Sequence, residues 1–77
     1  MKTITISLPS VDAVRSFNNK IFGLSGDFDL GSGRYIVDAR SIMGIFSLDL
    51  SKPVSLTINS DNEEVVVEAI REFIVTE

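Results

Sequence analysis

The spacing of apolar residues changes repeatedly along this chain between the period of a strand and the period of a helix, which limits the folds open to it. Alternation over residues 3–8 and 54–59 predicts two half-buried strands. Spacings of three and four after Ser10 and after Ser60 predict two helices, each with one core-facing stripe. The stripe residues are Val11, Val14, Phe17 and Ile21 in the first helix, and Val66, Ala69, Ile70 and Phe73 in the second.

The middle of the chain predicts a hairpin and then a short helix. Alternation over residues 28–30 and the β-forming residues 35–37 predict two strands, joined by a turn at the Gly-Ser-Gly of residues 31–33. Ser41 is a suitable N-cap for a short helix that runs to Leu48. In that helix we expect Ile45 and Leu48 to face the core.

The predicted elements follow the order strand, helix, strand, strand, helix, strand, helix. Two strands joined by a tight turn are antiparallel, and helices gathered on one face of such a sheet give an α+β layered fold. With 77 residues the chain has room for one hydrophobic core. We therefore expect a single domain over residues 1–77, with its threonine-rich and serine-rich sheet face toward solvent.

For the last helix, Ser60 and Glu63 match a capping box.

The composition excludes several classes of function. A net charge of −4 without a basic cluster argues against nucleic-acid binding. The absence of cysteine fits a reducing compartment, and the absence of histidine removes the commonest general base and metal ligand. No apolar run suits a signal peptide or a membrane span. We therefore expect a cytoplasmic protein with no cofactor, no metal, no membrane contact and no nucleic-acid partner.

Acidic residues near the start of the last predicted helix are the remaining candidates for catalysis. They are Asp61, Glu63, Glu64 and Glu68, and their spacing is typical of a solvated helix face. The glycines at 31 and 33 match no phosphate-binding loop, and no serine has a histidine to activate it. We therefore expect that the chain is not an enzyme.

The segment Arg40-Ser41-Ile42-Met43-Gly44, with Ser47-Leu48 after it, resembles the regulatory-serine segment of HPr, the histidine-containing phosphocarrier of the sugar phosphotransferase system. In that family the segment reads Lys-Ser-Ile-Met-Gly, followed by Ser-Leu. The order of the predicted elements also matches over essentially the whole chain. The resemblance implies an open-faced β-sandwich, in which a four-stranded antiparallel sheet carries three helices on one face.

The resemblance also exposes a difference at the family's phosphate site. Aligned with the family, Ser10 occupies the position of the phosphate-accepting histidine at the start of the first helix. Asp12 occupies the position of the arginine that neutralises the phosphate, and a carboxylate repels an anion. The resemblance therefore implies a protein without phosphohistidine carrier activity, and we interpret Ser10 as an N-cap and assign no catalytic residue.

Two functional candidates remain. Ser41 corresponds to the serine that a dedicated kinase phosphorylates so that HPr binds a transcriptional regulator, and Arg40 lies beside it. Ile42, Met43 and Phe46 correspond to an exposed apolar patch that docks partner proteins, and a short helix cannot bury every apolar side chain. The simpler interpretations are an N-cap at Ser41 and ordinary packing of the other three residues.

These candidates lead to three hypotheses. The first is a regulatory or adaptor module that binds a protein partner, either a kinase or a transcriptional regulator of the HPr type. The second is a structural or oligomerising domain that keeps the HPr fold only. The third is an enzyme that uses carboxylates, although no two acidic residues are placed in an apparent pocket. The family resemblance by itself also implies a component of the phosphotransferase system. The oligomeric state and the identity of the partner stay open at this point.

Overall fold

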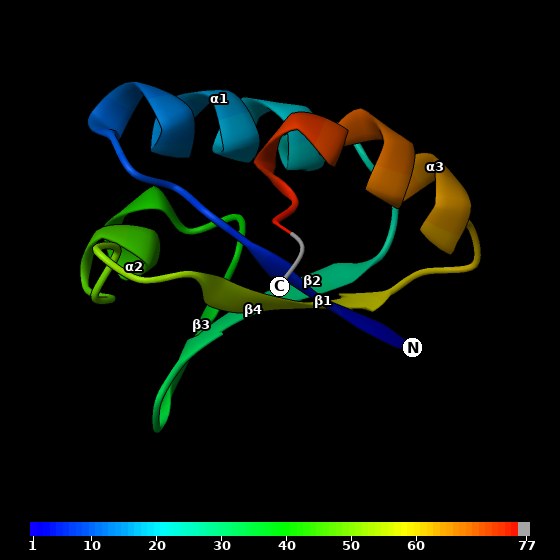
Figure 1. The fold of residues 1–77 in the computed structure, drawn as a ribbon. Coiled ribbons are helices and arrows are strands. Elements are labelled where there is room, and N and C mark those ends of the chain that lie inside the picture. The colour runs from blue at the N-terminus through cyan, green and yellow to red at the C-terminus, as the bar shows by residue number, and fades with distance from the viewer. Residues whose placement is uncertain (76–77) are drawn as a thin grey trace.

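The computed structural model describes residues 1–75, so the last two residues of the predicted domain, 76 and 77, lie outside the described part. Figure 1 shows the path of the chain and labels its elements. The elements are β1 (Lys2–Ile6), α1 (Val11–Phe22), β2 (Asp27–Ser32), β3 (Tyr35–Asp38), α2 (Ile42–Phe46), β4 (Val54–Asn59), α3 (Glu63–Ala69) and a 3-10 turn (Arg71–Phe73).

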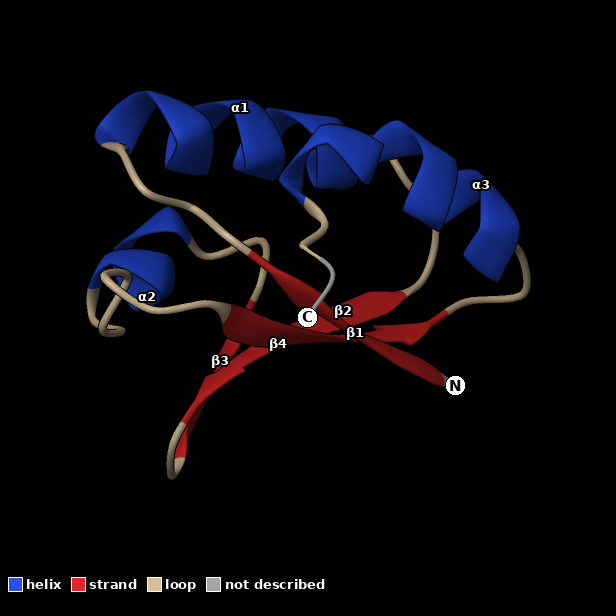
Figure 2. Cartoon of the chain, viewed as in Figure 1, coloured by secondary structure: helices blue, strands red, loops and turns tan. Residues whose placement is uncertain are grey.

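The four strands form one antiparallel sheet in the order β1-β4-β2-β3. The central strand β4 pairs with β1, where Leu56 lies opposite Ile4, and with β2, where Ile58 lies opposite Phe28. Figure 2 shows α1 and α3 above the sheet and α2 beside one end of it, on the same side. The predicted α+β fold, with three helices and a four-stranded antiparallel sheet, is confirmed.

The hydrophobic core lies between the sheet and the helices. Strand alternation contributes Val54, Leu56 and Ile58 from β4, which are all buried. From the helix side, the ring of Phe17 meets the ring of Phe73 edge to face, with centroids 5.7 Å apart. No helix among residues 1–75 has both the length and the apolar character needed to span a bilayer.

The two predicted apolar stripes are largely correct, but the structure differs from each of them at one point. In α1, Val14, Phe17 and Ile21 are buried, but Val11 is 54% exposed. Periodicity identifies the face of a helix that points toward the core, but it does not show how far the covering elements extend along that face. In α3 the regular helix ends at Ala69, and the rest of the stripe continues as a 3-10 turn. The buried residues of that stripe are Val66, Ile70 and Phe73.

The hairpin turn lies two residues later than predicted. β2 continues to Ser32, which pairs with Tyr35, so the turn consists of Gly33 and Arg34 and not of residues 31–33. Gly33 has a φ of 59°, a conformation that suits glycine at the first position of a two-residue hairpin loop. The outcome is a tighter hairpin with four paired positions.

The predicted capping box at the last helix is wrong. The N-cap of α3 is Asn62, and no side chain caps this helix. The Ser60 hydroxyl instead donates to the carbonyl of Ser25 at 2.9 Å and accepts from the backbone N–H of Asn62 at 3.2 Å. Ser60 thus joins the loop before α3 to the loop after α1, and this tertiary contact takes the place of the predicted local cap.

Candidate functional site

The start of α2 is held in place by backbone and side-chain hydrogen bonds. The Ser41 hydroxyl accepts from the backbone N–H of Gly44 at 3.2 Å, and the Ser41 N–H donates to the carbonyl of Asp38 at 3.0 Å. Gly44 allows the helix to lie close to β3, since a Cβ at this position would lie 3.2 Å from the Cβ of Val37. The predicted N-cap at Ser41 is therefore present, and the Ser41 side chain is exposed.

The segment before α2 is tied to α1 and to the loop after it. The Asn18 side chain of α1 donates to the carbonyl of Arg40 at 2.9 Å. The Arg40 guanidinium donates to the carbonyl of Gly26 at 2.7 Å and to the carbonyl of Leu24, and it lies 4.9 Å from the centroid of the Phe28 ring. Tertiary contacts thus already occupy the Arg40 guanidinium, although Arg40 lies beside Ser41 in the sequence.

The apolar residues of α2 divide into a buried and an exposed set. Ile45 and Leu48 are buried, as predicted. Met43 is 78% exposed and Phe46 is 41% exposed, whereas Ile42 is half-buried and packs against the core. The helix has only five residues, from Ile42 to Phe46, because Ser47 caps its C-terminus. We call the exposed and half-buried side chains of Ile42, Met43 and Phe46 the α2 surface.

Ser10 caps α1 in the same way that Ser41 caps α2. Its hydroxyl accepts from the backbone N–H of Ala13 at 3.1 Å, and the residue is exposed. Asp12 is the acidic residue of the first turn, where the helix dipole favours a negative side chain. The same carboxylate disfavours a second anion at Ser10, and the sequence has no histidine at any position.

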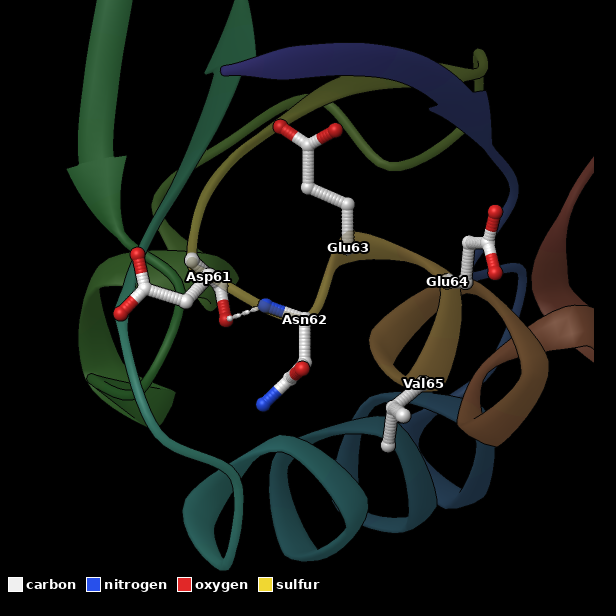
Figure 3. A pocket seen from close by; sticks show the side chains of 6 residues that line it. Asp61, Asn62, Glu63, Glu64 and Val65 are labelled. Atoms are coloured by element: carbon white, nitrogen blue, oxygen red, sulfur yellow. Dashed lines mark hydrogen bonds between the residues drawn. The ribbon is translucent and has the colours of Figure 1, made fainter.

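The acidic residues near α3 do not form a paired site. Asp61, Glu63 and Glu64 line a shallow hollow at the start of α3, and in Figure 3 their carboxylates point in different directions. Glu68 lies in a second hollow, together with Lys2. Acid and base catalysis by two carboxylates requires that both face one reacting group. Within residues 1–75, no cluster of three histidine, cysteine, aspartate or glutamate residues could hold a metal ion.

Asp49, in the loop after α2, is the one group in this region with a clear pKa shift. The hydroxyl and then the backbone N–H of Ser51 donate to its carboxylate, and these hydrogen bonds lower the pKa of Asp49. The contact closes a local turn between α2 and β4, so it serves the shape of the loop.

Sequence reasoning missed several exposed apolar side chains outside α2. They are Val11 and Phe22 on α1, Tyr35 and Ile36 on β3, and Val65 on α3. The side chains of Tyr35 and Ile36 point to opposite faces of the sheet, and both are exposed because β3 lies at its edge, a position that only the strand order shows.

Comparison with known proteins identifies close structural neighbours. A structure described as HPr-C-His from Thermoanaerobacter tengcongensis has a TM-score of 0.81 and 28% sequence identity, and the match covers 96% of this chain and 91% of the other. A phosphocarrier protein HPr from Bacillus anthracis has a TM-score of 0.74 and 22% identity, covering 96% and 94%. A histidine-containing phosphocarrier protein from a mycoplasma has a TM-score of 0.73 and 9% identity, covering 92% and 86%. No protein-family model and no curated protein sequence matches the chain.

Proposed function

Because this chain is an HPr-like protein, we propose that it acts by binding a protein partner through the α2 surface and that Ser41 is the position where phosphorylation regulates this binding. Its fold is that of phosphocarrier-type proteins. The observation that carries the proposal is the exposure of Met43 and Phe46 on a helix that begins at an exposed serine. The partner belongs to the HPr-type kinases or transcriptional regulators, and the proposal includes a cytoplasmic location.

Transfer of phosphate through histidine is not part of the proposed function. The sequence contains no histidine, and Ser10 takes the corresponding position at the start of α1. A serine phosphoester is a poor phosphoryl donor compared with the phosphoramidate that histidine forms. Asp12 adds a negative charge in the same helical turn, which further disfavours phosphate there.

The chemistry of the α2 surface suits protein docking. The helix has no acidic residue in its first turn and no basic residue in its last, so charged side chains do not interrupt its apolar residues. Met43 has a flexible and polarizable side chain that adapts to different contact surfaces, and Phe46 supplies a large rigid one. Ile42 and Ile45 fix the helix to the core, which keeps the exposed pair in a defined position.

Phosphorylation of Ser41 would change the charge at the edge of this surface. The phosphate would keep the backbone N–H of Gly44 as a hydrogen-bond donor, since the Ser41 hydroxyl already accepts from that group. The Arg40 guanidinium is engaged by the carbonyls of Leu24 and Gly26. We therefore expect the positively charged partner of the phosphate to come from the bound protein. Recognition of the phosphorylated form therefore depends on a basic side chain of the partner placed beside its apolar contact.

The test is incubation of the purified protein with an HPr kinase and ATP, followed by intact mass measurement and peptide mapping. We expect one added phosphate on Ser41, absent in the Ser41→Ala variant. Ser10→Ala is the matched control, because it removes the other exposed N-cap serine, and it should be phosphorylated like the original chain. A second pair of variants tests the surface: Met43→Ser with Phe46→Ser should abolish phosphorylation, whereas Val65→Ser on α3 should not.

Two results would contradict the proposal. If Ser41 stays unmodified while the same kinase modifies an ordinary HPr, the regulatory role of Ser41 fails. If Ser41 is modified equally well without Met43 and Phe46, the kinase does not use the α2 surface. A chain that also fails to bind an HPr-type transcriptional regulator would fit the hypothesis of a structural domain that keeps the fold only.

A further inference from the structure

The two edges of the sheet are treated differently by the rest of the chain. The β1 edge is covered in part by the C-terminal segment, because Ser7 donates from its backbone N–H to the carbonyl of Phe73 at 2.8 Å and Val75 donates to the carbonyl of Thr5 at 3.1 Å. The β3 edge pairs only with β2 within residues 1–75. An uncovered edge presents free backbone donors and acceptors to another strand.

The register of the hairpin fixes which backbone groups of β3 point outward. Ser32 and Tyr35 flank a two-residue turn, and such flanking residues hydrogen-bond to each other. The backbone N–H and carbonyl groups of Tyr35 and Val37 therefore point toward β2. The Ala39 N–H, which donates to the carbonyl of Phe28 at 2.8 Å, continues that pattern. The backbone N–H and carbonyl of Ile36 consequently point away from the sheet.

The residues whose backbone groups point away from the sheet carry side chains that can pair with the same residues of a second copy of the chain. Arg34 at the end of the turn, and Ile36 and Asp38 of β3, follow one another along the edge as a positive charge, an apolar residue and a negative charge. The Asp38 carbonyl already accepts from the Ser41 N–H at 3.0 Å and the Asp38 carboxylate from the Arg40 N–H at 2.9 Å. Within residues 1–75, the free backbone groups of this edge are therefore those of Ile36. If two copies pair antiparallel with Ile36 opposite Ile36, Arg34 of each copy lies opposite Asp38 of the other. Tyr35 then lies opposite Val37, so every position of the strand has a compatible neighbour.

The surroundings of this strand leave room for a second copy. Tyr35 is 73% exposed and Ile36 is 74% exposed, although both are large apolar side chains. In Figure 1 the tip of the β2–β3 hairpin points away from the helices, so they do not cover it. The strand also has no lysine or proline, which are common devices against edge pairing.

We propose that the β3 edge is a self-association site, where two copies of this chain pair through antiparallel β3 strands with Ile36 opposite Ile36. The contact is isologous, so it closes at two copies and joins two four-stranded sheets into one continuous sheet. This proposal goes beyond the proposed function, since the α2 surface takes no part in the pairing.

The test is sedimentation equilibrium over a series of protein concentrations, at low ionic strength. The original chain should show a monomer–dimer equilibrium. Arg34→Asp places two carboxylates opposite each other at both ends of the paired strands, and Asp38→Arg does the same with two guanidinium groups. Each variant alone should weaken the dimer by at least about tenfold, because like charges directly opposite are destabilising. Mixing the two variants in equal amounts should restore the dimer, since the mixed pair has opposite charges at both ends.

The matched control is Arg15→Asp on α1, which changes the net charge as Arg34→Asp does but lies in the helix layer. A monomer at every concentration overturns the proposal, and so does a dimer that Arg34→Asp and Asp38→Arg leave unchanged. Hydrogen exchange of the Ile36 amide gives an independent readout on the original chain. The exchange of this amide should slow as the protein concentration rises. If the sample contains dimer but the exchange rate is the same at low and high concentration, the two copies do not meet at the β3 edge, and the proposal is overturned.

Discussion

α1 and α2 begin alike but differ in length and in the number of side chains that they bury. Each starts after an exposed serine whose hydroxyl accepts from the N–H three residues later, Ser10 in α1 and Ser41 in α2. α1 then runs for twelve residues and buries one face, whereas α2 has five residues and buries only Ile45. The same cap thus starts one helix that buries three side chains, Val14, Phe17 and Ile21, and another that buries only one.

The difference in length explains the difference in role. A helix of three turns can place several side chains of one stripe against the sheet, and α1 buries Val14, Phe17 and Ile21 in this way. One turn cannot do this, because side chains separated by one or two positions point in different directions around the helix axis. Met43 and Phe46 are therefore exposed on α2 although they are as apolar as the buried residues of α1. Stability is expected to depend on α1 and recognition on α2.

The largest expected effect is on stability, and it belongs to α1. Phe17→Ala removes a fully buried ring that contacts Phe73, and should lower the free energy of unfolding by about 3–5 kcal/mol. Urea unfolding followed by circular dichroism measures the change. A loss below about 1 kcal/mol would mean that α1 is not the principal helix of the core.

The two serine caps should contribute equally to stability and unequally to modification. Ser10→Ala and Ser41→Ala should each cost about 1 kcal/mol, because each leaves one backbone N–H of the first turn without its side-chain acceptor. The same unfolding experiment measures both values. Only Ser41→Ala should also remove phosphorylation by an HPr kinase, and equal loss of phosphate in both variants would remove the distinction between the two helices.

Substitutions on the α2 surface should hardly change stability. Met43→Ser should alter the free energy of unfolding by no more than about 0.5 kcal/mol, since the side chain is 78% exposed. It should nevertheless weaken binding to an HPr kinase by about tenfold, as measured by calorimetry. Val65→Ser on α3 is the matched control, and it should leave binding unchanged. If both variants bind as the original chain does, exposure alone does not identify the docking surface.

The smallest effect concerns the loop that connects α2 to β4. Hydrogen bonds from Ser51 lower the pKa of Asp49 in the folded chain below its value in the unfolded chain. The stabilisation is therefore present above the unfolded pKa and is lost as the pH falls through the folded pKa. An NMR titration of the Asp49 carboxyl should show the lowered pKa, and Ser51→Ala should raise it toward the ordinary value. An unchanged pKa in that variant would assign the shift to another group.

The sequence predicted the layers of the fold well because apolar periodicity reports directly on burial. β4 and the stripe of α1 from Val14 to Ile21 follow the expected pattern. The failures lie where a tertiary contact overrides a local signal. Ser60 bonds across to the loop after α1 and leaves α3 without a side-chain cap. Such contacts join residues far apart in the sequence, so no local pattern could predict them.

The candidate site was predictable in part. The short helix after Ser41 and the burial of Ile45 followed from the sequence, because one turn of helix has only one core-facing side. The half-buried position of Ile42 and the exposure of Val11 depend on how far neighbouring elements extend, which periodicity does not encode. The free β3 edge required the strand order, since the sequence does not show which strands lie at the edges of the sheet.

The most direct test of the central claim is an NMR titration of the isotope-labelled chain with an unlabelled HPr kinase. The account predicts that the amide signals of residues 41–47 shift or lose intensity, while those of α3 stay unchanged. The same titration with Met43→Ser and Phe46→Ser combined should leave every signal in place. Unchanged signals in the original chain, or changes confined to α3, would contradict the claim that the α2 surface binds the partner.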